Sequence, residues 1–311
     1  MTLPQNFIGV DIAKDWIDVF YLSTSKHERI PTTKQSLTRF AKSVRDGFVI
    51  FEASGGYERC VAEALARAGT PYARVNPRQA REFARAMGKL AKTDRVDAQI
   101  LALMGRALNP ARTMPDDPDT ARLADLVARR GVLVGQIRAE KNRLQTTRDD
   151  WISKEISIMI RVLEDHLAAV EGQIETLISA RKALAEQSAR LCSVPGIGPA
   201  ISAVLIACLP ELGQLDARKI AALAGLAPHA ADSGIHRGKR RIWGGRETAR
   251  RALYIAAFIA SRYDPTIKAF RKRLQEAGKP LKVAITACAR KLLTILNAMA
   301  KKGESYVKQT G

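Results

Sequence analysis

The chain has 311 residues, of which 46% are hydrophobic and 26% charged, so it is long and apolar enough to bury a globular core in two or three domains. Its 51 Lys and Arg residues outnumber 31 acids, and a net charge of +20 indicates a polyanionic partner such as nucleic acid. The cysteines lack metal-ligand spacing, so we expect reduced thiols. The apolar run at residues 200–210 is too short for a bilayer, and no signal-peptide pattern opens the chain. We therefore expect no membrane segment and a cytoplasmic location.

The first 110 residues alternate strand and helix patterns. Ser36 is a plausible N-cap for the first helix, and Gly69 follows the second at the usual place of a helix C-terminus. Three strands followed by β-α-β units predict a mixed sheet covered by helices. The expected strands are 7–13, 16–23, 29–33, 48–53 and 71–75, and the expected helices are 36–44, 57–68, 78–87 and 93–108.

The middle of the chain is predicted to be long helix. Prolines 110, 115 and 118 suggest a linker, and no proline follows until Pro195, while apolar residues recur at helical spacing. One continuous helix would reach about 100 Å, whereas two helices folded back near 148–151 would be more economical. Either form suits pairing with a second copy of the chain as a coiled coil, and the alternative is a helical hairpin internal to one subunit.

From Leu191 onward the pattern predicts a helical domain, with helices at 219–227, 247–263 and 282–301 and a loop at 228–245. The segment from Val194 to Pro199 resembles the turn of a helix-hairpin-helix module, in which Gly196 and Gly198 would let backbone amides approach a phosphate. The same residues also suit a simple tight turn. The expected domains are therefore 1–112, 113–188 and 189–311.

Four carboxylates stand out in the first domain. Asp11 interrupts an apolar strand, where a charge is costly without partners, and Glu52 ends another strand. Asp94 and Asp97 share one helix face. If the strands follow the ribonuclease-H order, the strands of Asp11 and Glu52 are neighbours and the helix lies over them, which predicts a site for Mg²⁺ or Mn²⁺.

Each acid also has an ordinary interpretation. The two helical aspartates suit a first helical turn on electrostatic grounds alone. Glu58 competes with Glu52 for the role at the strand end, although a helix cap or ion pair suits it better. We expect Asp15 to be a turn residue and Asp18 to lie on a solvated strand face.

A glycine-punctuated basic loop follows in the C-terminal domain. Between Ser233 and Arg251 there are seven Lys or Arg residues and one acid, a density that suits contacts with phosphates. On the residues alone, Ser233 is an ordinary turn serine and His236 an unremarkable loop histidine. The expected nucleic-acid contacts in this loop are Arg237, Lys239, Arg240, Arg241 and Arg246.

Taken together, these motifs resemble a known family over essentially the whole chain. They are Gly-Val-Asp-Ile-Ala-Lys at 9–14, Phe-Glu-Ala-Ser-Gly-Gly-Tyr at 51–57, Lys-Thr-Asp-Arg-Val-Asp-Ala at 92–98, Pro-Gly-Ile-Gly at 195–198, and Asp-Ser-Gly at 232–234 ahead of Arg-Ile-Trp-Gly-Gly-Arg at 241–246. This ordered set is similar to the DEDD transposases of the insertion-sequence one-ten family, relatives of the Piv-like DNA invertases.

The resemblance implies a fold and a mechanism. It implies a RuvC-like, ribonuclease-H-type domain with Asp11, Glu52, Asp94 and Asp97 as catalytic metal ligands, a coiled-coil middle, and a helical transposase domain. There Ser233 would be the nucleophile that forms a phosphoserine link to DNA, activated by the metal, while nearby Arg side chains would stabilise the developing charge.

The resemblance also implies partners. They are donor and target DNA, a structured non-coding bridge RNA, and a homodimer that assembles into a tetramer at the prokaryotic nucleoid. Two other functions stay open at this point: a hydrolytic RuvC-like nuclease in which Ser233 is structural, and a non-catalytic nucleic-acid-binding protein.

Overall fold

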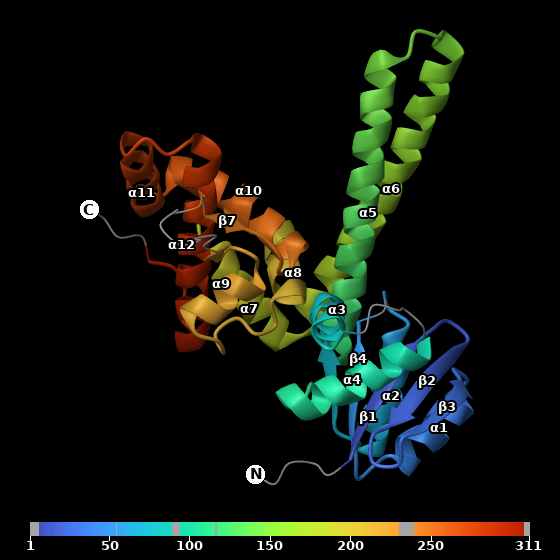
Figure 1. Ribbon diagram of the computed structural model, residues 1–311. Helices are drawn as coiled ribbons and strands as arrows, with labels where there is room; N and C mark the ends of the chain where they lie inside the picture. Colours follow the sequence, from blue (N-terminus) through green and yellow to red (C-terminus); the bar gives the residue numbers. More distant parts are fainter. Residues whose placement is uncertain are drawn as a thin grey trace. The chain divides into compact units, whose positions relative to one another are not determined.

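The computed structural model describes residues 6–53, 55–88, 94–115, 117–229, 238 and 240–307, with the backbone but not the side chain of Asp94. The chain divides into two compact units, Met1–Asp116 and Asp117–Gly311 (Figure 1). The segments expected at 113–188 and 189–311 therefore fall almost wholly within one unit. The first unit is α/β and the second is almost entirely helical.

The first unit contains a five-stranded mixed sheet in the order β3-β2-β1-β4-β5. The strands β1 (Phe7–Ile12), β2 (Trp16–Tyr21) and β3 (Lys26–Pro31) pair antiparallel, while β4 (Phe48–Glu52) lies parallel to β1 and β5 (Tyr72–Val75) lies parallel to β4. This confirms the predicted mixed sheet and places the strand of Asp11 beside the strand of Glu52.

Helices cover both faces of this sheet. The side chains of Ile8, Val10, Val49 and Phe51 form one core with α1 (Lys34–Ser43) and α2 (Glu58–Ala68). The opposite face packs against α4 (Asp94–Leu108), which also contacts α3 (Pro77–Ala86). The predicted N-cap Ser36 is wrong, because the backbone amide of Ser36 donates to the hydroxyl of Thr33, which caps α1.

Two glycines allow α4 to lie directly on the sheet. A Cβ on Gly9 would stand 1.9 Å from the carbonyl oxygen of Ala98, and a Cβ on Gly105 would stand 2.6 Å from Cγ1 of Ile50. Since residue 98 lies over residue 9 while residue 105 lies against Phe7 and Ile50, α4 runs antiparallel to β1. The start of α4 therefore lies toward the end of β1.

The second unit begins with a helical hairpin. The helices α5 (Pro118–Thr146) and α6 (Asp150–Ala180) are capped by Asp117 and Asp149 and joined by a turn at 147–149. The ion pairs Arg130–Glu171 and Lys141–Glu164, at 2.8 and 2.7 Å, tie the two helices together along their length. The prediction of two helices folded back on each other is thus confirmed, and the alternative of one continuous long helix is wrong.

The base of the hairpin shares a core with the remaining helices. Leu123 and Val127 of α5 and Ile174 and Leu177 of α6 belong to the same buried cluster as the C-terminal helices. That shared core explains why the hairpin does not form a unit of its own. The other elements are α7 (Lys182–Cys192), α8 (Pro199–Cys208), α9 (Ala217–Leu223), the strands β6 (Pro228–His229) and β7 (Arg241–Ile242), α10 (Glu247–Tyr263), α11 (Pro265–Glu276) and α12 (Leu281–Lys302).

The structure also contains α11 and two short strands that the sequence pattern did not predict. Asp264 separates α11 from α10 by a single residue, and its carboxylate accepts from the amide of Ile267. Among the described residues, α12 is the one helix long and apolar enough to cross a membrane by length and composition. Its side chains at Ile285, Cys288 and Leu292 are fully buried in the core of the unit, as in the core helix of a globular domain.

Candidate active site

Asp11 and Glu52 lie at the C-terminal ends of two neighbouring parallel strands, Asp11 one residue before the end of β1 and Glu52 at the end of β4. Val10 pairs with Phe51, so the next residue on each strand, Asp11 on β1 and Glu52 on β4, stands beside the other at the same edge of the sheet. Both side chains are partly exposed, and Oδ1 of Asp11 accepts a hydrogen bond from the amide of Ile12 at 3.1 Å. Strand pairing therefore brings Asp11 and Glu52, the first two predicted metal ligands, side by side at one end of the sheet.

Both acids face α4. Side chains alternate along a strand, so Asp11 and Glu52 lie on the same face as the residues two positions earlier, Gly9 and Ile50. Gly9 lies against Ala98 of α4, and Ile50 lies against Gly105 of the same helix. Asp97 precedes Ala98, is partly buried, and belongs to the end of α4 that lies toward Asp11. Asp94 begins the helix one turn earlier, and its side chain lies outside the described residues.

The donor set suits a hard divalent cation, because all the donors are carboxylate oxygens from three elements that meet on one face of the sheet. Within the described side chains, no group of three His, Cys, Asp or Glu residues is close enough to hold a metal ion. The fourth acid, Asp94, is not among those side chains. The backbone arrangement agrees with the predicted metal ligands, and their assignment stays a prediction.

A fifth acid, Asp18, lies on the same face. It pairs directly with Asp11 across β1 and β2 and has a relative exposure of 6%. Its two oxygens accept from Nε and Nη2 of Arg29 on β3, at 3.0 and 2.8 Å. The expectation of a solvated Asp18 is wrong, because the helix covers this face and Arg29, its partner on the next strand, neutralises the buried charge.

Positive groups border the acidic edge. The Arg29 guanidinium stacks on the ring of Trp16, 4.9 Å from its centroid. Burial lowers the pKa of His27, as does the charge of Arg95 on the first turn of α4, while the nearby Asp18 opposes the shift. The edge therefore carries carboxylates toward its centre, with the ion-paired Arg29 on its β3 side and Arg95 close to His27.

In the second unit, a short ribbon marks the ends of the basic loop. Pro228 pairs with Ile242 and His229 with Arg241, which brings residues 229 and 241 together. The rings of His229 and Trp243 lie 4.8 Å apart at the ribbon. Arg240 and Arg241 are exposed, as phosphate contacts require. Ser233, Arg237 and Lys239 lie outside the described residues, so their predicted roles stay predictions.

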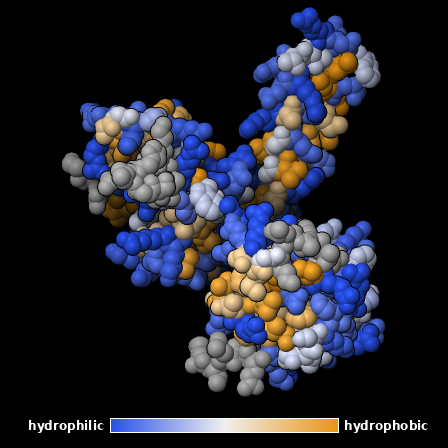
Figure 2. All heavy atoms as spheres, viewed as in Figure 1, coloured by the Kyte–Doolittle hydropathy of each residue, from blue (hydrophilic) through white to orange (hydrophobic). Residues whose placement is uncertain are grey.

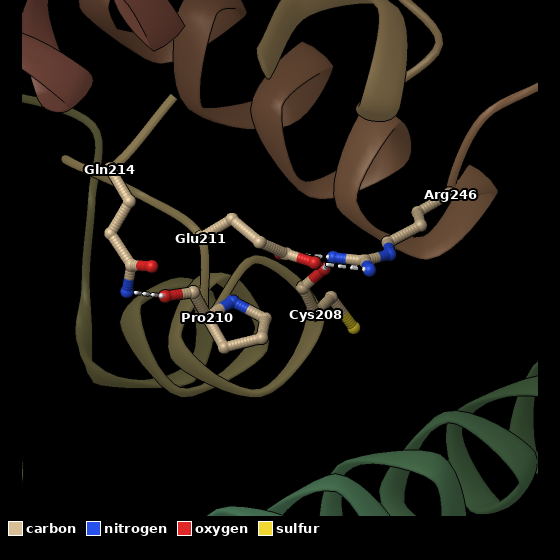
Figure 3. Close-up of polar contacts among 5 residues, drawn as sticks. All are labelled: Cys208, Pro210, Glu211, Gln214 and Arg246. Atoms are coloured by element: carbon tan, nitrogen blue, oxygen red, sulfur yellow. Dashed lines mark hydrogen bonds and ion pairs between the residues drawn. The ribbon is translucent and has the colours of Figure 1, made fainter. Parts of the chain in front are cut away.

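Arg246 has a different environment from the other predicted contacts. Its guanidinium forms a two-pronged ion pair with Glu211, with Nη2 and Oε1 2.7 Å apart, and Nη1 donates to the carbonyl oxygen of Cys208 at 2.9 Å (Figure 3). Burial raises the pKa of the Cys208 thiol, and the nearby Arg246 charge acts against that shift. Arg246 thus has intramolecular side-chain partners that, among the described residues, its exposed neighbours Arg240 and Arg241 lack, and its predicted role in nucleic-acid binding stays a prediction.

The two glycines of the predicted phosphate-binding turn differ. Gly196 has φ +93°, and a Cβ there would lie 2.5 Å from the carbonyl oxygen of Ala256, so packing against α10 already requires glycine. Gly198 is exposed at the N-cap of α8, with open space where a Cβ would stand. Only Gly198 combines exposure with a helix N-terminus, the arrangement that suits an anion.

Comparison with known proteins gives consistent matches. Residues 8–150 match a family described as transposase, of the DEDD type and named for the insertion element IS110, the one-ten element, and residues 188–272 match one described as transposase IS116/IS110/IS902 family. The chain is 28% identical over 321 aligned residues to the pilin gene-inverting proteins of Moraxella bovis and Moraxella lacunata, covering 99% of each chain. It is also 29% identical over 160 residues to an uncharacterised protein of insertion element IS110 from Streptomyces coelicolor, covering 50% of this chain and 38% of that one.

Proposed function

Because the chain belongs to the IS110 family of transposases, we propose that it is a site-specific recombinase that cleaves and rejoins DNA through an acidic metal site and a serine nucleophile. The observation that carries this proposal is that Asp11 and Glu52 lie side by side at one end of the sheet, toward which the first turn of α4, with Asp97, also lies. The full-length similarity to pilin gene-inverting proteins supports DNA inversion or transposition as the class of reaction.

The first unit is proposed to be a RuvC-like catalytic domain. Asp11, Glu52, Asp94 and Asp97 would hold Mg²⁺ or Mn²⁺, which would stabilise negative charge on the phosphate during strand exchange. The strand order β3-β2-β1-β4-β5 supports this assignment, because it puts the two strand acids next to each other beneath α4. Arg29 would keep the buried charge of Asp18 from competing with these ligands.

Ser233 is proposed to be the nucleophile. Its hydroxyl oxygen forms a bond to phosphorus, the bond from phosphorus to a deoxyribose oxygen breaks, and the proton of the hydroxyl ends on the departing oxygen. A hydroxyl of another strand then reverses the exchange and restores the serine. This scheme requires the acids and the serine to meet at one phosphate, within one chain or between two subunits.

The proposed partners follow from charge and family. Arg240 and Arg241 are exposed beside the ribbon, and the excess of basic residues suits donor and target DNA together with a structured guide RNA. A homodimer that assembles into a tetramer would supply the several active sites that two duplexes need. We place the protein in the cytoplasm, at the nucleoid.

The exposed apolar face of the helical hairpin supports self-association. On α6 it is formed by a stripe of Trp151, Ile152, Ile158, Met159 and Val162, all between 45% and 72% exposed. Figure 2 shows apolar side chains along the hairpin among many hydrophilic ones. Such a stripe is typical of a helix that pairs with another subunit.

The central test traps a covalent protein–DNA adduct. End-labelled DNA carrying the element junction is incubated with the protein, its guide RNA and Mg²⁺, and the denatured products are separated and the linked residue mapped. We expect the adduct to map to Ser233 and to be lost in Ser233→Ala, Asp11→Ala and Glu52→Ala. Ser179→Ala and Asp15→Asn, at exposed positions, serve as matched controls.

The competing functions predict different results. A hydrolytic RuvC-like nuclease loses cleavage in Asp11→Ala but retains it in Ser233→Ala, and forms no adduct. A non-catalytic binding protein retains its DNA affinity in every variant and shows no metal-dependent cleavage. Either pattern would overturn the proposal.

A further inference from the structure

We propose that Arg246 is a positioning residue: its ion pair with Glu211 fixes the base of the basic ribbon to the core of the second unit, and so supports the connection that carries the proposed nucleophile, rather than binding a phosphate. This inference rests on the proposed role of Ser233. It also gives a different role to Arg246, which the basic sequence around it predicts to be a nucleic-acid contact.

The side chain of Arg246 is already committed to the protein. Its two terminal nitrogens bond to both oxygens of Glu211, and one of them also donates to the carbonyl oxygen of Cys208. Figure 3 shows the guanidinium pointing toward Glu211 and the carbonyl of Cys208. Cys208 is the last residue of α8, so the cation meets the negative end of that helix dipole as well as a carboxylate.

The backbone around Arg246 is fixed in the same way. Its amide donates to the carbonyl oxygen of Leu223 in α9 at 2.8 Å. Gly245 has φ +66°, and a Cβ there would stand 2.3 Å from the amide nitrogen of Gly225. Nη1 of Arg250 donates to the carbonyl oxygen of Gly244 at 2.6 Å. The chain leaving β7 is thus held against the end of α9 by side-chain and main-chain contacts together.

The other end of the ribbon is fixed to the same place. The amides of Leu226 and Ala227 both donate to the carbonyl oxygen of Ala221 in α9, directly before β6 begins. The connection that contains Ser233 therefore starts and ends at α9. Loss of the Arg246–Glu211 pair would remove the side-chain part of the contacts that hold one of these two ends, and misplacement of a reacting group by about 1 Å can cost on the order of 100-fold in rate.

The test separates positioning from phosphate binding by charge exchange. We would compare Arg246→Gln, Glu211→Gln and the double variant Glu211→Arg/Arg246→Glu, with Lys219→Gln as the control that removes one charge from an exposed ion pair on α9. The readouts are the rate of adduct formation at saturating DNA, the Kd for DNA, the salt dependence of that Kd, and the melting temperature.

For a positioning role we expect both single variants to slow adduct formation on the order of 10- to 100-fold while the Kd stays within about twofold of wild type. The double variant should recover at least part of the rate, because it restores an ion pair of opposite orientation. A phosphate contact predicts that Arg246→Gln weakens DNA binding, lowers the salt slope by about 1, and is not matched by Glu211→Gln. That result, or failure of the double variant to recover any rate in a folded protein, would overturn the inference.

Failure of the proposed function would be visible separately. If the wild-type protein forms no adduct, the serine mechanism is wrong, and amide hydrogen exchange still tests the anchoring of the ribbon. Anchoring predicts faster exchange for the amides of Leu226, Ala227 and Arg246 in both single variants and near wild-type exchange in the double variant. Unchanged exchange in the single variants would show that the ion pair does not hold the ribbon.

Discussion

Asp11 and Asp18 lie directly opposite each other on β1 and β2, on the face of the sheet that α4 covers. Like charges at paired positions of neighbouring strands destabilise a sheet. Here the bidentate bond from Arg29 neutralises Asp18, which reduces the repulsion between the two aspartates. Of the two, Asp11 is the one that lies next to Glu52. The ion pair thus links the stability of the sheet to the electrostatics of the proposed metal site.

Substitution Asp18→Ala should destabilise the first unit by about 1–2 kcal/mol, because it leaves a stacked, half-exposed arginine without its carboxylate partner. Chemical denaturation followed by circular dichroism measures this loss. Glu28→Ala is the matched control: Glu28 lies on β3, beside Arg29, and its carboxylate accepts from the hydroxyl of Tyr21 at an exposed position. Equal losses in the two variants would contradict a special role for Asp18.

Gly9→Ala should have a larger effect, because its new methyl group would collide with the backbone of α4 at Ala98. We expect a loss of at least about 2 kcal/mol in unfolding free energy together with loss of cleavage, since α4 carries Asp97. Gly131→Ala provides the control: residue 131 lies within α5, with open space around it, so the change should raise stability by up to about 1 kcal/mol. An active, fully stable Gly9→Ala protein would contradict the close packing described here.

The sequence alone predicted the parts of the site that depend on local pattern. Asp11 stands out because its neighbours are apolar. The pairing of its strand with that of Glu52 is expected only if the strands follow the ribonuclease-H order, and the observed order agrees. The sequence does not reveal that Arg29 pairs with Asp18, because that contact depends on the register of a third strand. Glu211 lies 35 residues before Arg246, so nothing in the local basic pattern distinguishes this arginine from its exposed neighbours.

The hairpin stripe makes a prediction about assembly. Ile158→Glu places a charge in the middle of the exposed apolar face of α6 and should shift the protein toward monomer, with little change in melting temperature because residue 158 is 49% exposed. Sedimentation velocity over a range of protein concentrations measures the shift. Ser179→Glu adds the same charge on the same helix outside the stripe and should leave the assembly unchanged. An identical distribution for the Ile158 variant would exclude this face as an interface.

Tyr306 provides a prediction about alkaline stability. Its hydroxyl donates to Oδ2 of Asp264 at 2.6 Å, and burial together with this bond raises the pKa of Tyr306 to about 12. A tyrosine in the unfolded chain ionises near a pKa of about 10, so as the pH rises from 10 toward 12 the unfolded state loses its proton first and the stability contributed by Tyr306 falls.

Tyr306→Phe should therefore cost about 1 kcal/mol of unfolding free energy at pH 8, and the difference from wild type should shrink as the pH rises above 10. Urea denaturation at a series of pH values from 8 to 11 measures both effects. Tyr263→Phe is the control: Tyr263 precedes Asp264 in the chain and is 69% exposed, so the unfolding free energy of this variant should match wild type at every pH. A constant difference between Tyr306→Phe and wild type across this range would mean that the bond to Asp264 does not hold the phenolic proton in the native state.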